Sequence, residues 1–168
     1  FTGPLWTDSH GFTLPPMSKT ILITGAGTGI GKDTAFALSK RGHRILATTQ
    51  TEAQAEALKQ AAHAQGLQIE VFKLDITAEQ DRELLSQYAV DVLINNAALG
   101  ESGSLAEVDM QRVRHLFEVN LFATLELTQV ALKQMIQRQS GTFARRNGST
   151  QKERPHCRHR TRRHSHWV

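Results

Sequence analysis

The stretch Thr24-Gly25-Ala26-Gly27-Thr28-Gly29-Ile30-Gly31 decides the fold, because it joins an apolar segment to an amphipathic one. Residues 20–23, Thr-Ile-Leu-Ile, predict a strand, and residues 30–41 predict a helix. Glycine lacks a Cβ atom, so this chain can turn tightly and bring its backbone close to a ligand. The first N–H groups of a helix have no partner within the helix and lie at the positive end of its dipole. The segment therefore predicts a binding site for the pyrophosphate of a dinucleotide.

The spacing of the glycines supports this interpretation more than their number does. An ordinary glycine-rich turn between a strand and a helix is the alternative. Such a turn explains one glycine, but it does not explain glycines at all of positions 25, 29 and 31.

The composition is typical of one soluble domain with a hydrophobic core, since 39% of the 168 residues are hydrophobic. No apolar run approaches the ~20 residues of a membrane helix, so we expect no membrane partner. Residues 1–6 have neither the basic nor the apolar region of a signal peptide. The chain has one cysteine, Cys157, which excludes an internal disulfide framework. We therefore expect a reducing, cytoplasmic setting.

Positive charge is concentrated at the end of the chain. Residues 144–168 hold eight Lys or Arg and one acid, whereas residues 1–143 hold twelve Lys or Arg and fifteen acids. The net charge of +4 is therefore no argument for specific nucleic-acid binding by the folded part. The histidines and the cysteine of the tail match no standard zinc spacing, so we expect no metal site.

We expect three regions: a disordered leader over residues 1–16, a nucleotide-binding domain over residues 17–143, and a basic tail over residues 144–168 that is disordered or translated out of frame. Within the domain, strand and helix patterns alternate. Capping boxes begin two of the helices, at Thr51-Glu52-Ala53-Gln54 and at Thr77-Ala78-Glu79-Gln80. The further expected strands are 44–48, 68–74 and 90–95, and the further expected helices are 51–66, 77–88 and 110–139.

This alternation predicts an α/β fold, with a Rossmann-type doubly wound parallel sheet that is incomplete on its C-terminal side. In such a sheet the ligand lies beyond the carboxyl ends of the strands, where the glycine-rich stretch also lies. A fifth strand begins at residues 141–143, but the composition changes abruptly at Ala144. Without the later strands, we expect strand 20–23 to be exposed along one side, together with an apolar helix face that includes Val113, Leu116, Phe117 and Leu121.

Three further sites follow the glycine-rich stretch: Asp75 after strand 68–74, Asn95-Asn96-Ala97-Ala98 after strand 90–95, and Asn120 within the long helix. Taken together, these motifs resemble the short-chain dehydrogenase/reductase family over about residues 18–142. The resemblance implies an NAD(P)-dependent oxidoreductase that transfers hydride between a nicotinamide and a small carbonyl or alcohol substrate. It also implies a homo-oligomer formed through the long helix, residues 110–139.

The resemblance also implies a role for each motif. The glycines would hold the pyrophosphate, with Ile30 beneath it. Asp75 would accept a hydrogen bond from the adenine amino group, and Asn95 and Asn96 would bond neighbouring strands and line the ribose. Asn120, the candidate catalytic residue, would bend its helix and hold a water in a proton relay. The full candidate cofactor set is Thr24, Gly25, Gly27, Thr28, Gly29, Ile30, Gly31, Thr49, Gln50, Asp75, Ile76, Asn95, Asn96, Ala97 and Ala98.

Structural alternatives remain open for these polar residues. Asp75 also fits a loop carboxylate before a helix, the two asparagines fit a polar turn, and Asn120 fits a hydrogen-bonded core amide. Ala98 departs mildly from the family pattern, which prefers glycine there.

The end of strand 44–48 bears on the choice of cofactor. An acid there would accept a bond from the ribose 2′-hydroxyl and repel a 2′-phosphate, but Thr49 and Gln50 are neutral. We therefore favour NADP over NAD, with Lys32 and Arg44 as candidate phosphate partners.

The catalytic Tyr-x-x-x-Lys pair of the family does not occur in this sequence. The only tyrosine, Tyr88, has Val92 at the fourth position after it and suits a helix-end aromatic at the core edge. Ser149 is the nearest candidate serine, but no tyrosine follows it. We therefore expect this chain to be inactive alone. A non-catalytic dinucleotide-binding or sensing module is the alternative, and a frameshift or truncation near residues 142–144 would explain the tail.

Overall fold

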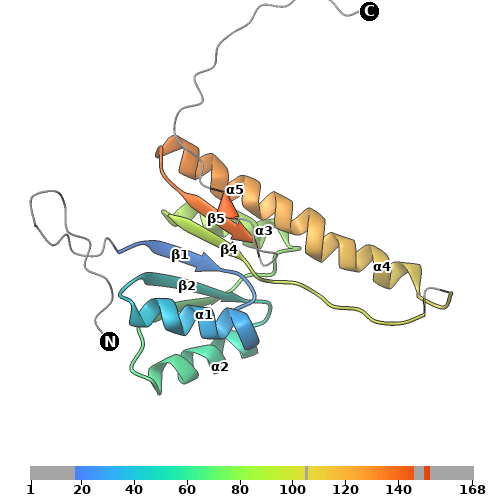
Figure 1. Cartoon of the computed structure of the whole chain (residues 1–168), viewed down its shortest axis with the longest axis horizontal. Coiled ribbons are helices and arrows are strands. Elements are labelled where there is room, and N and C mark those ends of the chain that lie inside the picture. Colours follow the sequence, from blue (N-terminus) through green and yellow to red (C-terminus); the bar gives the residue numbers. More distant parts are fainter. Residues whose placement is uncertain (1–17, 105, 146–149, 152–168) are drawn as a thin grey trace, which may run out of the picture.

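The computed structural model describes residues 18–104, 106–145 and 150–151, and it shows one sheet with helices on both of its faces (Figure 1). The strands are β1 (Thr20–Ile23), β2 (Arg44–Thr49), β3 (Ile69–Lys73), β4 (Val92–Asn95), β5 (Thr142–Arg145) and β6 (Thr150–Gln151). The helices are α1 (Gly29–Lys40), α2 (Glu52–His63), α3 (Glu79–Glu83), α4 (Met110–Phe117) and α5 (Thr124–Gln137). A 3₁₀ turn, η1 (Leu84–Gln87), follows α3, and a π-helical segment, η2 (Glu118–Ala123), joins α4 to α5.

The strand order is β3-β2-β1-β4-β5-β6. The first five strands are parallel, and β6 pairs antiparallel with β5. This order confirms the predicted Rossmann-type sheet. The expectation that β1 is exposed along one side is wrong, because Ile21 pairs with both Ile45 of β2 and Val92 of β4. The chain crosses over after β3 and returns to the free side of β1, so the first strand becomes a central one.

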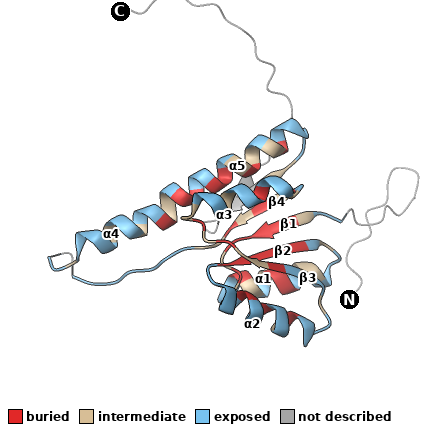
Figure 2. Cartoon of the chain, turned by 180° about the vertical axis from the view of Figure 1, so that it is seen from behind, coloured by how far each residue is buried: buried red, intermediate tan, exposed pale blue. Residues whose placement is uncertain are grey.

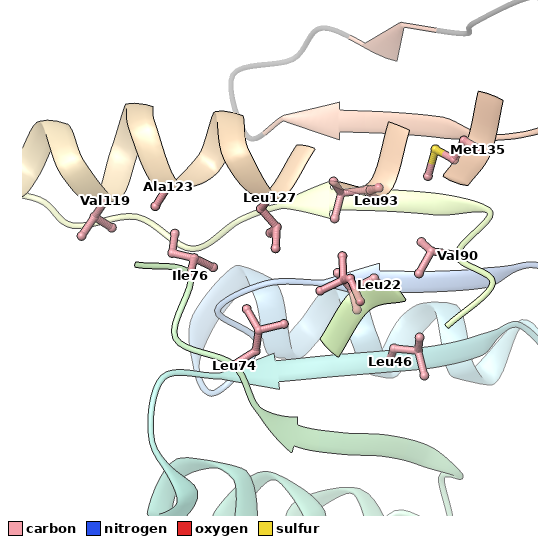
Figure 3. Packing of buried hydrophobic residues seen from close by; sticks show 12 residues of the cluster. Leu22, Leu46, Leu74, Ile76, Val90, Leu93, Val119, Ala123, Leu127 and Met135 are labelled. Carbon is pink, nitrogen blue, oxygen red and sulfur yellow. The ribbon is translucent and has the colours of Figure 1, made fainter. Parts of the chain in front are cut away.

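Alternating side chains of the strands supply two hydrophobic clusters, one on each face of the sheet. Ile21, Ile23 and Ile45 pack on the face that α1 and α2 cover. Leu22, Leu46 and Leu93 pack on the opposite face, against α5 and η2 (Figure 3). Buried residues therefore concentrate along the sheet and on the inner sides of the helices (Figure 2).

The two expected capping boxes have different outcomes. At α2, Gln54 N donates to Thr51 Oγ1 and Thr51 N donates to Gln54 Oε1, each at 3.3 Å, so this box is confirmed. The second box is wrong, because α3 begins at Glu79 with Ala78 as its N-cap and no side-chain cap. The Thr77 hydroxyl instead donates to Asp75 Oδ1 at 2.7 Å. The nearby carboxylate competes successfully for the hydroxyl that would cap the helix.

The long helix forms as expected, but it is not uniformly α-helical. The π segment adds a residue to one turn, which rotates the face of α4 by about 100° relative to α5. Phe117, which belongs to the apolar helix face that we expected to be exposed, is 51% exposed. The expected apolar exposure is present on this helix and includes Phe117, Phe122, Leu125 and Ile136.

Strand β5 continues past the change of composition at residue 144. Ala144 pairs with Ile94, and Arg145 pairs with Asn95. The division into a domain over residues 17–143 and a tail over residues 144–168 remains a prediction. The leader, residues 1–16, and most of the tail lie outside the described residues.

The capping box predicts how the stability of α2 depends on one hydroxyl. Replacing Thr51 by Ala leaves the Gln54 N–H without its acceptor, and we expect the free energy of unfolding to fall by about 1 kcal/mol. Thr51→Ser keeps the hydroxyl and is the matched control. The measurement is the urea midpoint of the two variants. Equal midpoints for the Ala and Ser variants would show that the box contributes nothing.

Candidate functional site

A cleft of about 300 Å³ lies beyond the carboxyl ends of β1 to β4, where the loops that leave these strands meet. It contains most of the candidate cofactor residues: Gly25, Gly27, Thr28, Gly29, Ile30, Thr49, Gln50, Asp75, Ile76, Asn96, Ala97 and Ala98. Thr24, Gly31 and Asn95 do not line it. The sequence did not point to five residues that do: Gln54, Leu74, Thr77, Leu99 and Val119. Four of them are direct neighbours in sequence of a candidate residue, and Gln54 lies four residues after Gln50. Apart from this proximity, the sequence carries no signal that they line a site.

The glycines of the β1–α1 loop are required for different steric reasons. A Cβ atom on Gly25, whose φ is +63°, would lie 2.7 Å from Ala97 Cα. A Cβ on Gly31 would lie 2.4 Å from Asn96 Nδ2 and 2.6 Å from Gly25 O. These two glycines let the loop pack directly on the end of β4. Gly29, with φ +55°, would point its Cβ into open space, so its requirement is the left-handed turn that begins α1.

Thr24 and Asn96 lock this loop to β4. The Thr24 hydroxyl oxygen, which is buried, accepts bonds from Asn96 N and Ala97 N, both at 3.0 Å. The Asn96 amide nitrogen in turn donates to Thr24 O at 3.0 Å and to Gly25 O at 2.9 Å. Asn96 therefore both lines the cleft and holds the carbonyls of the loop. Thr24 and Gly31 act behind the loop, by positioning it.

Asn95 does not lie where the resemblance implied. Successive side chains of a strand point to opposite faces, so Asn95 points away from the cleft and donates through Nδ2 to Thr128 Oγ1 of α5 at 2.8 Å. Among the described residues, its buried Oδ1 has no hydrogen-bond partner. Asn95 thus joins β4 to α5 and does not line the cleft.

Ala98 fits the site without strain. Among the described residues, the only non-glycine residue with a positive φ is Gln139, at +54°. The position that the family pattern gives to glycine therefore does not require one here, and Ala98 lines the cleft with its methyl group.

The wall formed by β2 carries no charge. Thr49 is buried and donates through Oγ1 to Thr51 O at 2.9 Å, while Gln50 is exposed beside it. Arg44 is not a phosphate partner, because it begins β2 at the opposite end of the sheet and pairs with Glu70 at 2.9 Å. Lys32 does not line the cleft either, and its Nζ lies 5.5 Å from the centroid of the Phe36 ring.

Among the residues that the structure describes, Asp75 is the one carboxylate that lines the cleft. Its Oδ1 accepts from Thr77 N at 2.9 Å and from Thr77 Oγ1 at 2.7 Å. Desolvation raises the pKa of Asp75, but the hydrogen bonds from Thr77 and Gln50 and the charge of Lys73 outweigh it, so the pKa lies below its ordinary value. Asp75 therefore presents an ionised acceptor at neutral pH.

Asn120 lies in the π segment and forms a two-bond contact with one residue of the loop that follows β4. Its Oδ1 accepts from Leu99 N at 2.8 Å, and its Nδ2 donates to Leu99 O at 2.8 Å. Single π turns inside α-helices occur frequently at functional sites. The contact connects the cleft wall at Leu99 to the long helix.

Tyr88 lies outside the cleft, as expected for a helix-end aromatic. It packs against the hydrophobic core and stacks on Phe72, with ring centroids 5.2 Å apart. Burial, followed by a bond to Glu70, raises the pKa of its phenol. In this place Tyr88 does not face the candidate site.

No helix in the described part of the chain is long and apolar enough to cross a bilayer. The described residues also contain no group of three or more His, Cys, Asp or Glu placed to hold a metal ion. The histidines and the cysteine of the tail lie outside that part.

Comparison with known proteins adds independent evidence. A family model described as short chain dehydrogenase matches residues 19–144. The chain is 33% identical over 130 residues to a diacetyl reductase, (S)-acetoin forming, of Staphylococcus epidermidis, covering 74% of this chain and 51% of that protein. It is 33% identical over 120 residues to human L-xylulose reductase, covering 71% and 48%.

Solved structures agree. An actinorhodin polyketide ketoreductase crystallised with NADPH gives a TM-score of 0.71 at 27% identity, covering 76% of this chain and 52% of that one. A short-chain dehydrogenase from Streptomyces avermitilis gives 0.69 at 31% identity, covering 79% and 49%. The chain spans about half the length of the relatives it matches. From the family model, the identities and the shared fold, the chain belongs to the short-chain dehydrogenase/reductase family.

Proposed function

We propose that this chain forms the nucleotide-binding half of an NAD(P)-dependent oxidoreductase, in which hydride passes between a nicotinamide and a small carbonyl or alcohol substrate. One observation carries the proposal. The glycine-rich loop packs on β4 without room for side chains at Gly25 and Gly31, and so brings backbone and the start of α1 to the cleft. That arrangement suits a diphosphate, which helix N-termini and exposed amides bind.

The other walls of the cleft suit the rest of a dinucleotide. The ionised carboxylate of Asp75 would accept from the adenine amino group, and Asn96, which also lines the cleft, would bind the ribose. Ile30, which is 63% exposed at the mouth of the cleft, offers an apolar surface to the cofactor. When bound, the nicotinamide supplies the hydride chemistry. The residues of this chain bind and orient it.

Asn120 is proposed to serve the proton transfer that accompanies hydride transfer. Its side chain holds Leu99, a residue of the cleft wall, by two bonds. Its own backbone lies in the π turn, a feature that is frequent at functional sites and that would hold a water of the proton relay.

Turnover by this chain alone is not proposed, because its only tyrosine is Tyr88 and the Tyr-x-x-x-Lys pair is absent from the sequence. A dinucleotide-binding or sensing module without catalysis is the second candidate, favoured by the same observation.

The two relatives named as reductases of diacetyl and L-xylulose support small carbonyl compounds as the substrate class of the complete protein. Self-association through the long helix is supported by its exposed apolar side chains, Phe117, Phe122, Leu125 and Ile136. A cytoplasmic setting is supported by the single cysteine of the sequence.

NADP is proposed as the preferred cofactor. Thr49 and Gln50, at the end of β2, add no negative charge that would repel a 2′-phosphate. The similar ketoreductase was crystallised with NADPH. The amide of Gln50 bonds to Asp75, and its second N–H is a neutral donor suited to such a phosphate.

A charge introduced at Gly29 tests the diphosphate site. Asp and Asn both tolerate a positive φ and meet open space at this position, so both Gly29→Asp and Gly29→Asn are expected to fold. The Asp variant places a carboxylate near the diphosphate, and we expect it to bind NADPH at least about tenfold more weakly than the Asn variant does. The measurement is a fluorescence titration with NADPH. Equal affinities of the two variants would contradict the proposal.

A charge at Gln50 tests the cofactor preference. For the unchanged chain we expect a lower dissociation constant for NADPH than for NADH. Gln50→Glu adds an acid of nearly the same shape, which repels a 2′-phosphate and accepts from a 2′-hydroxyl. We expect it to lower the NADPH-to-NADH affinity ratio by roughly tenfold or more. A ratio unaffected by the substitution would place the 2′ position elsewhere.

The lowered pKa of Asp75 predicts the pH dependence of adenine binding. A carboxyl group with a depressed pKa stays ionised below its ordinary range and loses its charge only as pH falls through the lower value. We therefore expect the ratio of wild-type to Asp75→Asn affinity for NAD⁺ to stay constant from about pH 8 to about pH 5 and to fall at lower pH. Calorimetric titration measures it. A fall that begins near neutral pH would show that the carboxylate is not held in its ionised form.

A further inference from the structure

The loop that carries Asp75 is held from behind by two consecutive residues of α3, Asp81 and Arg82. This loop, residues 75–77, runs from the end of β3 to the start of α3 and forms one wall of the cleft. Neither Asp81 nor Arg82 lines the cleft. Both nevertheless bond to the backbone of the loop. Asp81 bonds at Asp75, whose carboxylate lines the cleft, and Arg82 bonds at the next residue, Ile76.

Asp81 holds the first residue of the loop. Its Oδ2 accepts from Asp75 N at 2.7 Å and contacts Lys73 Nζ at 2.8 Å. The Asp81 side chain is 16% exposed, whereas that of Lys73 is 37% exposed. The bond to Asp81 is also the leading reason why the pKa of Lys73 is raised. Asp81 thus ties the end of β3 to the start of the loop, and Lys73 offsets the proximity of the two carboxylates.

Arg82 holds the second residue and connects it to α5. Its Nη1 donates to Ile76 O at 2.7 Å, and its Nη2 forms an ion pair with Glu126 Oε2. The Arg82 side chain is 11% exposed. Ile76 itself is buried in the cluster that includes Val119 and Ala123 of η2 (Figure 3). The guanidinium therefore fixes the carbonyl of a residue whose side chain is already fixed by packing.

We propose that Asp81 and Arg82 are positioning residues for adenine recognition, which hold the loop so that the Asp75 carboxylate faces the purine edge. This role rests on the proposed function of the cleft as a dinucleotide site. The third residue of the loop completes the arrangement, because both bonds from Thr77 end on Asp75 Oδ1 and fix the rotation of the carboxylate. Without the two α3 contacts, Asp75 N and Ile76 O would lose their partners, and the loop would adopt several conformations.

The positioning role is tested by selectivity for the purine base, which is the ratio of the affinities for the adenine and the hypoxanthine nucleotide. A loss of overall stability affects the binding of both nucleotides alike and leaves this ratio unchanged. Adenine carries an amino donor at C6, whereas hypoxanthine carries a carbonyl acceptor at the same position. A well-placed carboxylate accepts from the first and repels the second. We expect the unchanged chain to bind NADPH roughly tenfold more tightly than its hypoxanthine analogue, as measured by fluorescence titration.

Two variants remove the α3 contacts one at a time. Asp81→Leu keeps a branched side chain of similar shape but has neither the oxygen that accepts from Asp75 N nor the charge that pairs with Lys73. Arg82→Lys keeps the charge but cannot bond Ile76 O and Glu126 with one planar group. We expect each to reduce the tenfold selectivity to about threefold or less. Glu70→Gln is the matched control, because it breaks the Arg44–Glu70 pair at the opposite end of the sheet and leaves the selectivity unchanged.

The outcomes separate the two proposals. If both α3 variants retain the wild-type selectivity while Asp75→Ala abolishes it, the positioning role is overturned and the dinucleotide site stands. If the unchanged chain binds neither nucleotide, or binds both equally, the adenine site fails and the positioning role fails with it. A variant that melts at a lower temperature but keeps its selectivity also counts against the positioning role. Loss of selectivity in both variants with retention in Glu70→Gln supports it.

Discussion

The contact between the β1–α1 loop and the end of β4 is the interaction on which the site depends. Thr24 and Asn96 exchange hydrogen bonds across this contact, and at Gly31 a single added carbon would collide with Asn96. Because the loop lies flat on β4, its backbone reaches the cleft and the start of α1 points at the same place. The order of the central strands makes this contact possible, since only the crossover after β3 brings β4 beside β1.

The remaining walls are held in the same manner, by groups outside the cleft that bond to loop backbone inside it. Asn120 binds both polar backbone groups of Leu99. Asp81 accepts from Asp75 N, and Arg82 donates to Ile76 O. Such bonds satisfy the backbone of irregular segments that no strand partner satisfies. They also hold the cleft-lining residues by bonds that need no ligand, and such preorganisation reduces the ordering that binding requires.

Local patterns predicted a large part of this structure and failed where a distant or competing group intervened. The same threonine motif capped α2 at Thr51 but not α3 at Thr77, because only Thr77 has a carboxylate two residues before it. Adjacent asparagines predicted one shared role, whereas the alternation of the strand sends Asn95 to α5 and Asn96 to the loop. Arg44 was a plausible phosphate partner until the direction of β2 placed it at the far end of the sheet.

The sequence by itself determined the elements, the parallel sheet and the position of the glycine-rich turn, because these follow from periodicity and from the absence of Cβ atoms at fixed spacings. Only the tertiary structure decided which of the polar residues line the cleft and which support it. That distinction depends on bonds between residues far apart in the sequence, such as Thr24 with Asn96 and Leu99 with Asn120. It also depends on the π turn, whose extra residue alters the face that the long helix presents to the sheet.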